Sequence, residues 1–190
     1  MTRFLRFLPV LFLSAALAAP PLTQAVRPAN VVQAVTTYTD PVSAIQMQVP
    51  AGWRVRAETF NGVRQLRVVP PKADQRERAA IDVVVRLRPW RRGESLSGLA
   101  ASFRNQRGDR EAAQVVRYLP KAGRLVLDYR EGRYVSGRLW IVRRNLHLFQ
   151  RKDRTRVLEA RCAANASEYK TYRKSLELIC YSAQLTHGKS

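Results

Sequence analysis

Residues 53–68 constrain the fold most strongly, because two alternating segments meet there at Asn61-Gly62. An Asn-Gly pair favours a type I′ turn, since both positions tolerate positive φ. A two-residue loop at this point fixes the register of the flanking strands. The resulting pairs bring apolar residues together: Phe60–Val63, Ala57–Leu66 and Val55–Val68. The agreement predicts a β-hairpin whose Trp53 side faces the protein interior.

Similar alternation along the rest of the chain predicts an antiparallel sheet. The expected strands beyond the hairpin are 45–49, 81–87, 113–119, 124–131, 134–144, 146–151 and 155–162. The apolar run Leu139–Val142 predicts a central strand that is covered on both faces. Helical spacing of apolar residues predicts one helix over 96–103, after the N-cap Ser95. A second helix is expected over about 167–183, with Asn165 and Glu168 forming a capping box.

Length and composition fit one domain, with 46% hydrophobic residues in a chain of 190. We therefore predict a single α+β domain over 37–185, with a flexible leader over 26–36 and a disordered tail over 186–190. The fold class is an antiparallel sheet with two helices packed on it.

The first 25 residues are typical of a secretory signal peptide. Arg3 and Arg6 precede an apolar segment, and small residues follow it. Cleavage after Ala18 or after Ala25 both fit this pattern. The alternative is an uncleaved membrane anchor, but prolines within the segment oppose one long helix. We therefore expect export to the periplasm or the extracellular space, and no transmembrane segment in the mature chain.

Export changes the interpretation of Cys162 and Cys180, the only cysteines in the sequence. Two cysteines in one small domain tend to pair in an oxidising compartment, so we predict a disulfide. The alternative is a pair of buried free thiols, because cysteine packs well as a small apolar residue. A catalytic dithiol is not expected, since the C-x-x-C spacing is absent.

Residues 38–53 resemble the opening of the Mog1/PsbP-like superfamily. They contain an aromatic residue and Asp40, an alternating strand, and Pro50-Ala51-Gly52-Trp53 at the start of the next strand. The end of the chain is similar as well, because its last helix finishes with an apolar run followed by Ser182. The resemblance implies an α/β/α sandwich and an exported or organellar accessory protein that binds other proteins. It supplies no catalytic residues, because the superfamily has no common catalytic set.

The chain is strongly basic, with 34 Lys and Arg against 14 Asp and Glu. Arg56 is expected directly opposite Arg67, and like charges in that position repel. Glu58, Asp82 or a bound anion would compensate. The anion-binding candidates lie on one sheet face and at a hairpin tip: Arg54, Arg56, Arg67, Arg86, Arg88, Arg151, Lys152 and Arg154. A GC-rich genome and a need for solubility are alternative explanations of the arginine excess.

Catalytic signals are absent from the sequence. It has no Gly-x-Ser-x-Gly motif and no phosphate-binding glycine loop. His147 lies on a predicted strand, and His187 lies in the predicted tail. We therefore expect neither an enzyme nor a cofactor or metal. The preferred hypothesis is an exported, non-catalytic accessory protein of the bacterial envelope that binds an unidentified envelope protein. The alternative is a polyanion-binding module for nucleic acid, anionic lipid or acidic polysaccharide.

Overall fold

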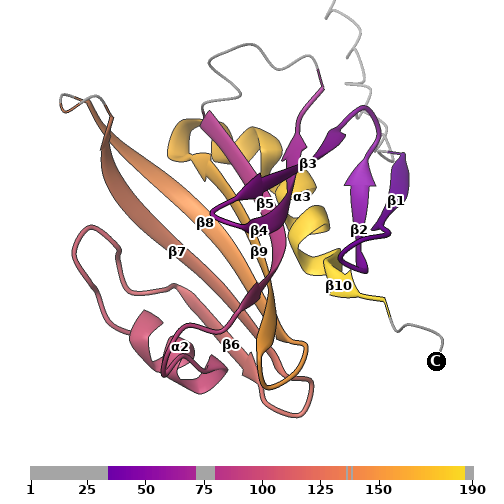
Figure 1. The fold of residues 1–190 in the computed structure, drawn as a ribbon. Coiled ribbons are helices and arrows are strands. Elements are labelled where there is room, and N and C mark those ends of the chain that lie inside the picture. Colours follow the sequence, from indigo (N-terminus) through magenta and orange to yellow (C-terminus); the bar gives the residue numbers. More distant parts are fainter. Residues whose placement is uncertain (1–33, 72–79, 136, 138, 187–190) are drawn as a thin grey trace, which may run out of the picture. The chain divides into compact units, whose positions relative to one another are not determined.

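The computed structural model describes residues 34–71, 80–135, 137 and 139–186. The predicted signal peptide and most of the predicted leader lie outside these ranges, as does His187. The described residues form two antiparallel sheets and two helices (Figure 1). The predicted fold class is confirmed: the protein is an antiparallel α+β fold with two helices packed on it.

The larger sheet has seven strands in the order β3-β4-β5-β9-β8-β7-β6. Their bounds are β3 Arg54–Phe60, β4 Val63–Val69, β5 Ile81–Pro89, β6 Val115–Leu119, β7 Arg124–Val135, β8 Leu139–Arg151 and β9 Arg156–Asn165. The smaller sheet has the order β1-β2-β10. Its strands are β1 Val35–Asp40, β2 Ile45–Pro50 and β10 Gln184–Leu185, and the helices are α2 Leu96–Phe103 and α3 Ala166–Ser182.

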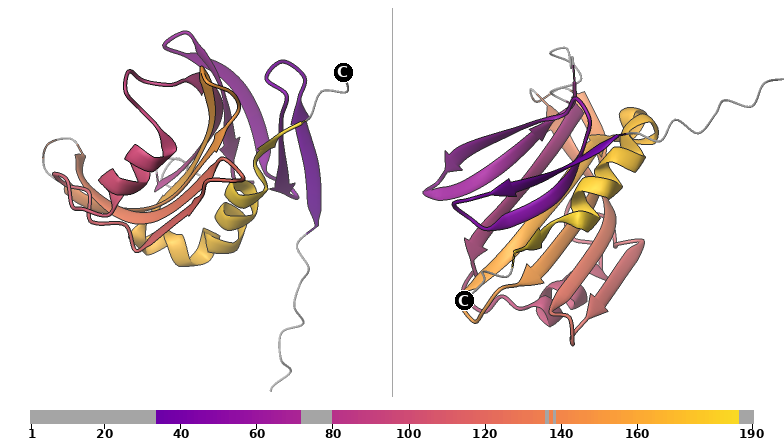
Figure 2. Two further views of the ribbon diagram at one scale, coloured as in Figure 1. Left: turned by 90° about the horizontal axis from the view of Figure 1, so that it is seen from below. Right: turned by 90° about the vertical axis from the view of Figure 1, so that its right-hand side faces the viewer.

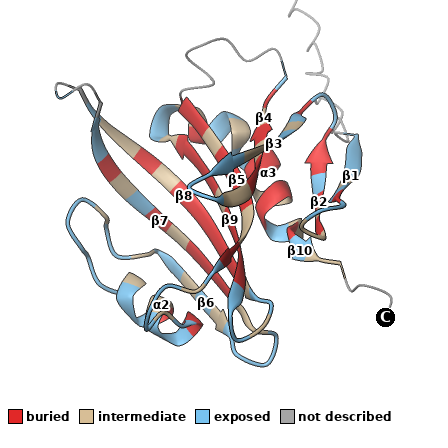
Figure 3. Cartoon of the chain, viewed as in Figure 1, coloured by how far each residue is buried: buried red, intermediate tan, exposed pale blue. Residues whose placement is uncertain are grey.

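The large sheet is curved, and the two helices lie on its opposite faces (Figure 2). Helix α2 lies on the concave face and α3 packs on the convex face. Apolar residues of β2 share one core with α3 and with the convex face, so α3 packs against both sheets. A second, smaller core lies between α2 and the concave face. Buried residues run along the middle strands of the large sheet (Figure 3).

The hairpin predicted at residues 53–68 is confirmed in its turn and in its register. Asn61 and Gly62 both have positive φ, 50° and 73°. The observed pairs are those expected, with Phe60 opposite Val63 and Arg56 opposite Arg67. Trp53 is buried in the core between α3 and the sheets, as its position at the start of the hairpin predicted.

Asp40 links the small sheet to this hairpin. Its carboxylate accepts two hydrogen bonds from Arg64 of β4, at 3.1 and 2.8 Å, and two more from Ser43. The hydrogen bonds from Arg64 outweigh the effect of burial and lower the pKa of Asp40 to about 2. The aspartate that carried part of the family resemblance therefore has a structural role.

The sequence predicted separate strands over 134–144 and 146–151, but the structure has a single strand, β8, over most of this region. The turn lies at Gly137, with φ of 67°, so β7 runs to Val135 and β8 is one continuous strand. Trp140 is exposed, because this end of β8 pairs with β7 and projects beyond β9. Its ring lies over Gly132, where a Cβ atom would approach Trp140 Cζ2 to 1.8 Å. The prediction that the run Leu139–Val142 is covered on both faces was wrong.

One helix cap and the two ends of the domain also differ from what the sequence predicted. The side chain of Asn165 makes no cap hydrogen bond to α3, so the predicted capping box is not formed. Strand β1 begins at Val35, inside the segment expected to be leader. Thr186, expected in the tail, donates hydrogen bonds from its backbone and its hydroxyl to the carbonyl of Ala44.

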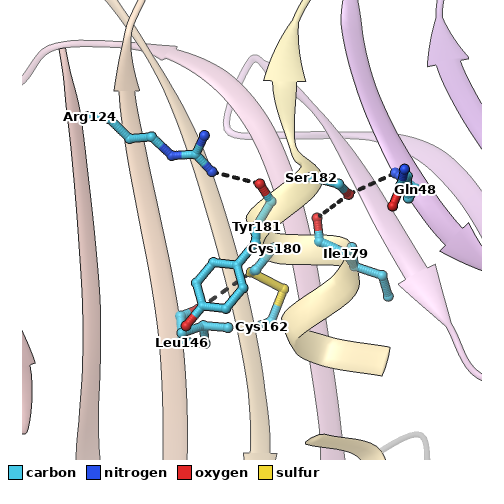
Figure 4. Close-up of a disulfide and its surroundings, with 8 residues drawn as sticks. All are labelled: Gln48, Arg124, Leu146, Cys162, Ile179, Cys180, Tyr181 and Ser182. Carbon is cyan, nitrogen blue, oxygen red and sulfur yellow. Dashed lines mark hydrogen bonds between the residues drawn. A yellow bond between two sulfur atoms is a disulfide. The ribbon is translucent and has the colours of Figure 1, made fainter. Parts of the chain in front are cut away.

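Cys162 of β9 and Cys180 of α3 form a disulfide beneath the convex face (Figure 4). Both residues are fully buried. Two polar contacts reinforce the same end of α3: Arg124 donates to the carbonyl of Tyr181, and the hydroxyl of Ser182 accepts from the backbone of Gln48. The C-terminal turns of α3 are thus joined to both sheets.

We predict that the double substitution Cys162→Ser and Cys180→Ser lowers the free energy of unfolding by about 3 kcal/mol. A crosslink across 18 residues restricts the unfolded chain by roughly that amount. Urea titration of the oxidised wild type and the variant measures the difference. Equal midpoints and slopes for the two proteins would contradict the prediction.

Candidate binding site on the concave face

Alternate residues of five neighbouring strands project their side chains onto the concave face. The pairing of the strands aligns these residues in rows across the sheet. One row is Arg56, Arg67, Val84, Arg161 and His147, and the next row is Glu58, Gln65, Arg86, Glu159 and Phe149. Charged residues that are distant in the sequence therefore lie side by side.

Helix α2 covers only part of this face. Its Leu96 and Ala100 share the smaller core with buried residues of β7, β8 and β9. Beside the helix lies a pocket of about 450 Å³. The residues that line it are Phe60, Gln65, Arg67, Asp82, Val84, Arg86, Arg88, Arg91, Glu94, Leu99, Phe103, Tyr129, His147, Phe149, Glu159 and Arg161. We call this pocket the concave site.

Glu159 lies at the floor of the concave site and is almost fully buried. Its Oε2 accepts hydrogen bonds from Arg88 Nε at 2.5 Å and from Arg86 Nε at 3.0 Å. Its Oε1 lies 2.9 Å from His147 Nε2. Burial alone would raise the pKa of Glu159, but these partners outweigh it and hold the pKa well below the ordinary value. The floor therefore carries a fixed negative charge surrounded by donors.

Asp82 forms a second ionic cluster at the edge of the concave site. It accepts from Arg67 Nη1 at 3.2 Å and from Arg161 Nη2 at 2.5 Å. Arg143 Nη1 lies 3.9 Å from the same carboxylate. Arg67 also donates to Glu58, which confirms that carboxylates compensate the Arg56–Arg67 pair. Three guanidinium groups thus share one aspartate at this edge.

His147 and Tyr129 lie side by side at the inner end of the pocket. The carboxylate of Glu159 accepts hydrogen bonds only, so His147 Nε2 carries the proton between them. The ring nitrogen Nδ1 is then the acceptor for the Tyr129 hydroxyl, 3.4 Å away. Burial lowers the pKa of His147 and raises the pKa of Tyr129. Both groups are neutral at pH 7.

The lining of the concave site is rich in arginine, carboxylate and aromatic side chains. The concave site does join His147 to a buried carboxylate, but none of its lining residues is Ser, Thr, Cys or Lys. Its only hydroxyl, on Tyr129, remains protonated because of burial. The groups present can hold charge and donate hydrogen bonds. Among the described residues no group of three His, Cys, Asp or Glu has the arrangement of a metal site.

The anion-binding candidates from the sequence fall into three places. Arg67, Arg86 and Arg88 line the concave site, where each is ion-paired. Arg88 is only 6% exposed. Its guanidinium lies between Glu94 and Glu159, which supply the charge that its burial requires. Arg54 and Arg56 lie on β3 and are exposed.

The remaining candidates lie at one end of the large sheet, where three loops meet (Figure 1). Arg151 donates its backbone N–H to Gly123, and Trp90 donates to the carbonyls of Asp153 and Thr155. These contacts gather six exposed cations, none of which takes part in an ion pair of the described residues: Arg91, Arg92, Lys121, Arg151, Lys152 and Arg154. We call this group the basic end.

Several residues at the centre of the concave site were not predicted from the sequence. Glu159 and Arg161 are two apart on an otherwise apolar strand, Val157–Ala164. That spacing places both on one face of a strand and was a usable signal. Tyr129 and Arg143 gave no such signal, because their strands carry polar residues on both sides.

Comparison with known proteins supports the fold. No family model and no curated protein sequence matches the chain. Mog1p of Saccharomyces cerevisiae, a Ran-binding protein, is 12% identical with a TM-score of 0.54, covering 80% of this chain and 96% of that one. LpqN of Mycobacterium tuberculosis is 16% identical, with a TM-score of 0.49 and coverage of 81% and 91%. CyanoP of Synechocystis sp. PCC 6803 is 12% identical, with a TM-score of 0.49 and coverage of 86% and 99%.

The protein thus has an α+β sandwich with a polar pocket on one sheet face. Its fold is that of Mog1p, as the resemblance of residues 38–53 to the Mog1/PsbP-like superfamily predicted. None of the helices in the described ranges is both long and apolar enough to cross a membrane.

We predict that Glu159→Gln lowers the free energy of unfolding by about 2–3 kcal/mol at pH 7, because buried arginine donors lose their charged acceptor. A carboxyl whose folded pKa is depressed stabilises the protein above its unfolded pKa, here near 4.5. The difference between wild type and variant should therefore narrow as the pH falls below that value.

Thermal and urea unfolding between pH 3 and 7 measures this difference. Glu111→Gln is the matched control, because Glu111 is exposed and its side chain is in none of the ion pairs described above. A difference that is constant over this pH range would contradict the assignment of Glu159 as an ionised group.

Proposed function

We propose that the protein is an exported, non-catalytic accessory protein of the bacterial envelope that binds its target through the concave site. One observation carries the proposal: the face of the large sheet that α2 leaves uncovered forms a recessed pocket. All of its charged side chains except Arg91 are already held by ion pairs, so little side-chain freedom is lost on binding.

Fold analogy and chemistry support this proposal. Mog1p has the same fold and is a Ran-binding protein, which is a precedent for protein binding on this scaffold. The composition of the first 25 residues and the buried Cys162–Cys180 pair favour an oxidising compartment outside the cytoplasm. The lack of Ser, Thr, Cys or Lys in the lining favours binding over catalysis.

Site-specific photo-crosslinking in the bacterium that encodes the protein tests this function. Phe60 lines the concave site and is 56% exposed, so a benzophenone amino acid at position 60 preserves an aromatic group there. We expect a discrete adduct in the envelope fraction. The adduct should contain a chain processed after Ala18 or Ala25, which mass spectrometry would identify.

The same substitution at Tyr181 is the control. Tyr181 is aromatic and 46% exposed, and it lies on α3, which packs on the opposite face of the large sheet. Adducts from position 60 alone support the proposal. Adducts from position 181 alone, no adducts from either position, or an unprocessed cytoplasmic chain would overturn it.

The basic end favours a second candidate function, binding to a polyanion. Six exposed cations that form no ion pair with any described residue gather there from loops that are far apart in the sequence. Arginine and lysine clusters of this kind attract phosphate, sulfate or carboxylate polymers. Arg67, Arg86 and Arg88 contribute less to such binding than expected, because their charges are already compensated.

We predict that affinity for a short DNA duplex, used as a model polyanion, falls linearly with salt on a log–log plot. Arg151→Gln, Lys152→Gln and Arg154→Gln together should reduce the slope by about 2–3, because each lost phosphate contact removes about one unit. Fluorescence anisotropy between low and physiological salt measures the slope. The control removes three exposed cations elsewhere: Arg104→Gln, Arg107→Gln and Lys174→Gln. Equal slopes for the two triple variants would contradict a role for the basic end.

A further inference from the structure

The concave site carries an excess of positive charge. Five arginines and three carboxylates line it, and the only histidine there is neutral. Each carboxylate already accepts from at least one guanidinium group: Glu159 from Arg86 and Arg88, Glu94 from Arg88, and Asp82 from Arg67 and Arg161. The lining therefore offers spare N–H donors, while its acceptors are occupied.

Donors without partners lie beside this pocket. Arg143 and Asn145 are on β8 and point to the same side of the sheet as His147, because they are four and two residues before it. Arg143 Nε and Nη2 and Asn145 Nδ2 are buried and have no hydrogen-bond partner among the described residues. Arg143 is 9% exposed, and burial lowers its pKa, so its guanidinium lacks adequate compensation. An anion near Asp82 would supply it.

The other side of the pocket is apolar and aromatic. Leu99 and Phe103 of α2 line it, and so does Phe60 at the end of β3. Phe103 packs edge-on against Tyr129, with ring centroids 4.9 Å apart. Phe149 lies between these residues and Glu159 in the lining. One pocket thus combines a cationic edge with an aromatic wall.

We propose that the concave site binds a small organic anion with an aromatic or acyl body. Its carboxylate, sulfonate or phosphate group is held by Arg67 and Arg161, and its apolar body lies against Phe103 and Tyr129. The pocket volume of about 450 Å³ suits such a molecule, since ligand pockets usually measure about 300–1,000 Å³. A cation or a sugar fits the site less well, because the carboxylate acceptors are occupied. This inference rests on the proposed function, in which the same site is the binding surface.

Two probes of similar shape distinguish the contribution of the negative charge to binding from the contribution of the apolar body. The probes are 2-naphthoate, an aromatic carboxylate, and 2-naphthalenemethanol, its uncharged analogue. We expect wild type to bind 2-naphthoate at least about 10-fold more tightly, because one charge-assisted hydrogen-bonded contact contributes about that factor. Isothermal titration calorimetry measures both affinities, and amide NMR shifts of β8 and β9 locate the site.

Substitution of the guanidinium groups tests the assignment. Arg161→Gln should remove most of the preference for 2-naphthoate and leave affinity for the alcohol unchanged. Arg67→Gln serves as a second variant that should fold, because Arg67 lies on β4, next to the edge strand β3. Arg154→Gln, at the basic end, removes the same charge and should change neither affinity.

Equal affinity of wild type for the two probes, or shifts confined to other surfaces, would overturn the inference. So would an unchanged preference in both Arg161→Gln and Arg67→Gln. These outcomes are distinct from failure of the proposed function. If position 60 still forms its adduct while 2-naphthoate does not bind, the ligand class is wrong and the binding function stands.

Discussion

The buried carboxylate of Glu159 is the interaction on which the concave face depends. It lies on β9, the middle strand of the large sheet, whose alternate residues serve two environments. Leu158 and Ala160 enter the core beneath α3, while Glu159 faces the opposite side. A buried charge costs several kcal/mol unless it is paired and hydrogen-bonded. Arg86 and Arg88 on the neighbouring strand meet that requirement, so the charges of β5 and β9 are mutually necessary.

This requirement changes the interpretation of the arginine excess. The sequence left two explanations open, attraction to a polyanion and a compositional bias. Neither explanation is needed for the presence of Arg67, Arg86 and Arg88. Their guanidinium groups form ion pairs with buried or half-buried carboxylates of the same sheet. Arginine suits this position better than lysine, since its planar fork can contact two carboxylates at once, as Arg88 does. The two explanations compete only for exposed cations such as those of the basic end.

Local patterns predicted the parts of the fold that depend on neighbours in the sequence. The Asn61-Gly62 turn determined the hairpin register, and the spacing of Leu96 and Ala100 determined the buried face of α2. The position of Gly137 was missed, because a run of apolar residues follows the turn and obscured it. The concave site was missed for a different reason. Which face of β9 remains uncovered depends on where α2 packs, and no local pattern contains that information.

The size of α2 explains why a pocket exists at all. Seven strands about 4.8 Å apart span roughly 29 Å, whereas a helix with its side chains is about 10 Å wide. On the convex face, α3 packs against the sheet and joins it to the small sheet in one core. On the concave face, α2 has only eight residues and packs on β6 and β7, so neither of the described helices lies above β4 and β5. Apolar residues on those strands would face water. Ion-paired residues such as Arg67 and Asp82 tolerate solvent, and they also form a surface that an anionic ligand can use.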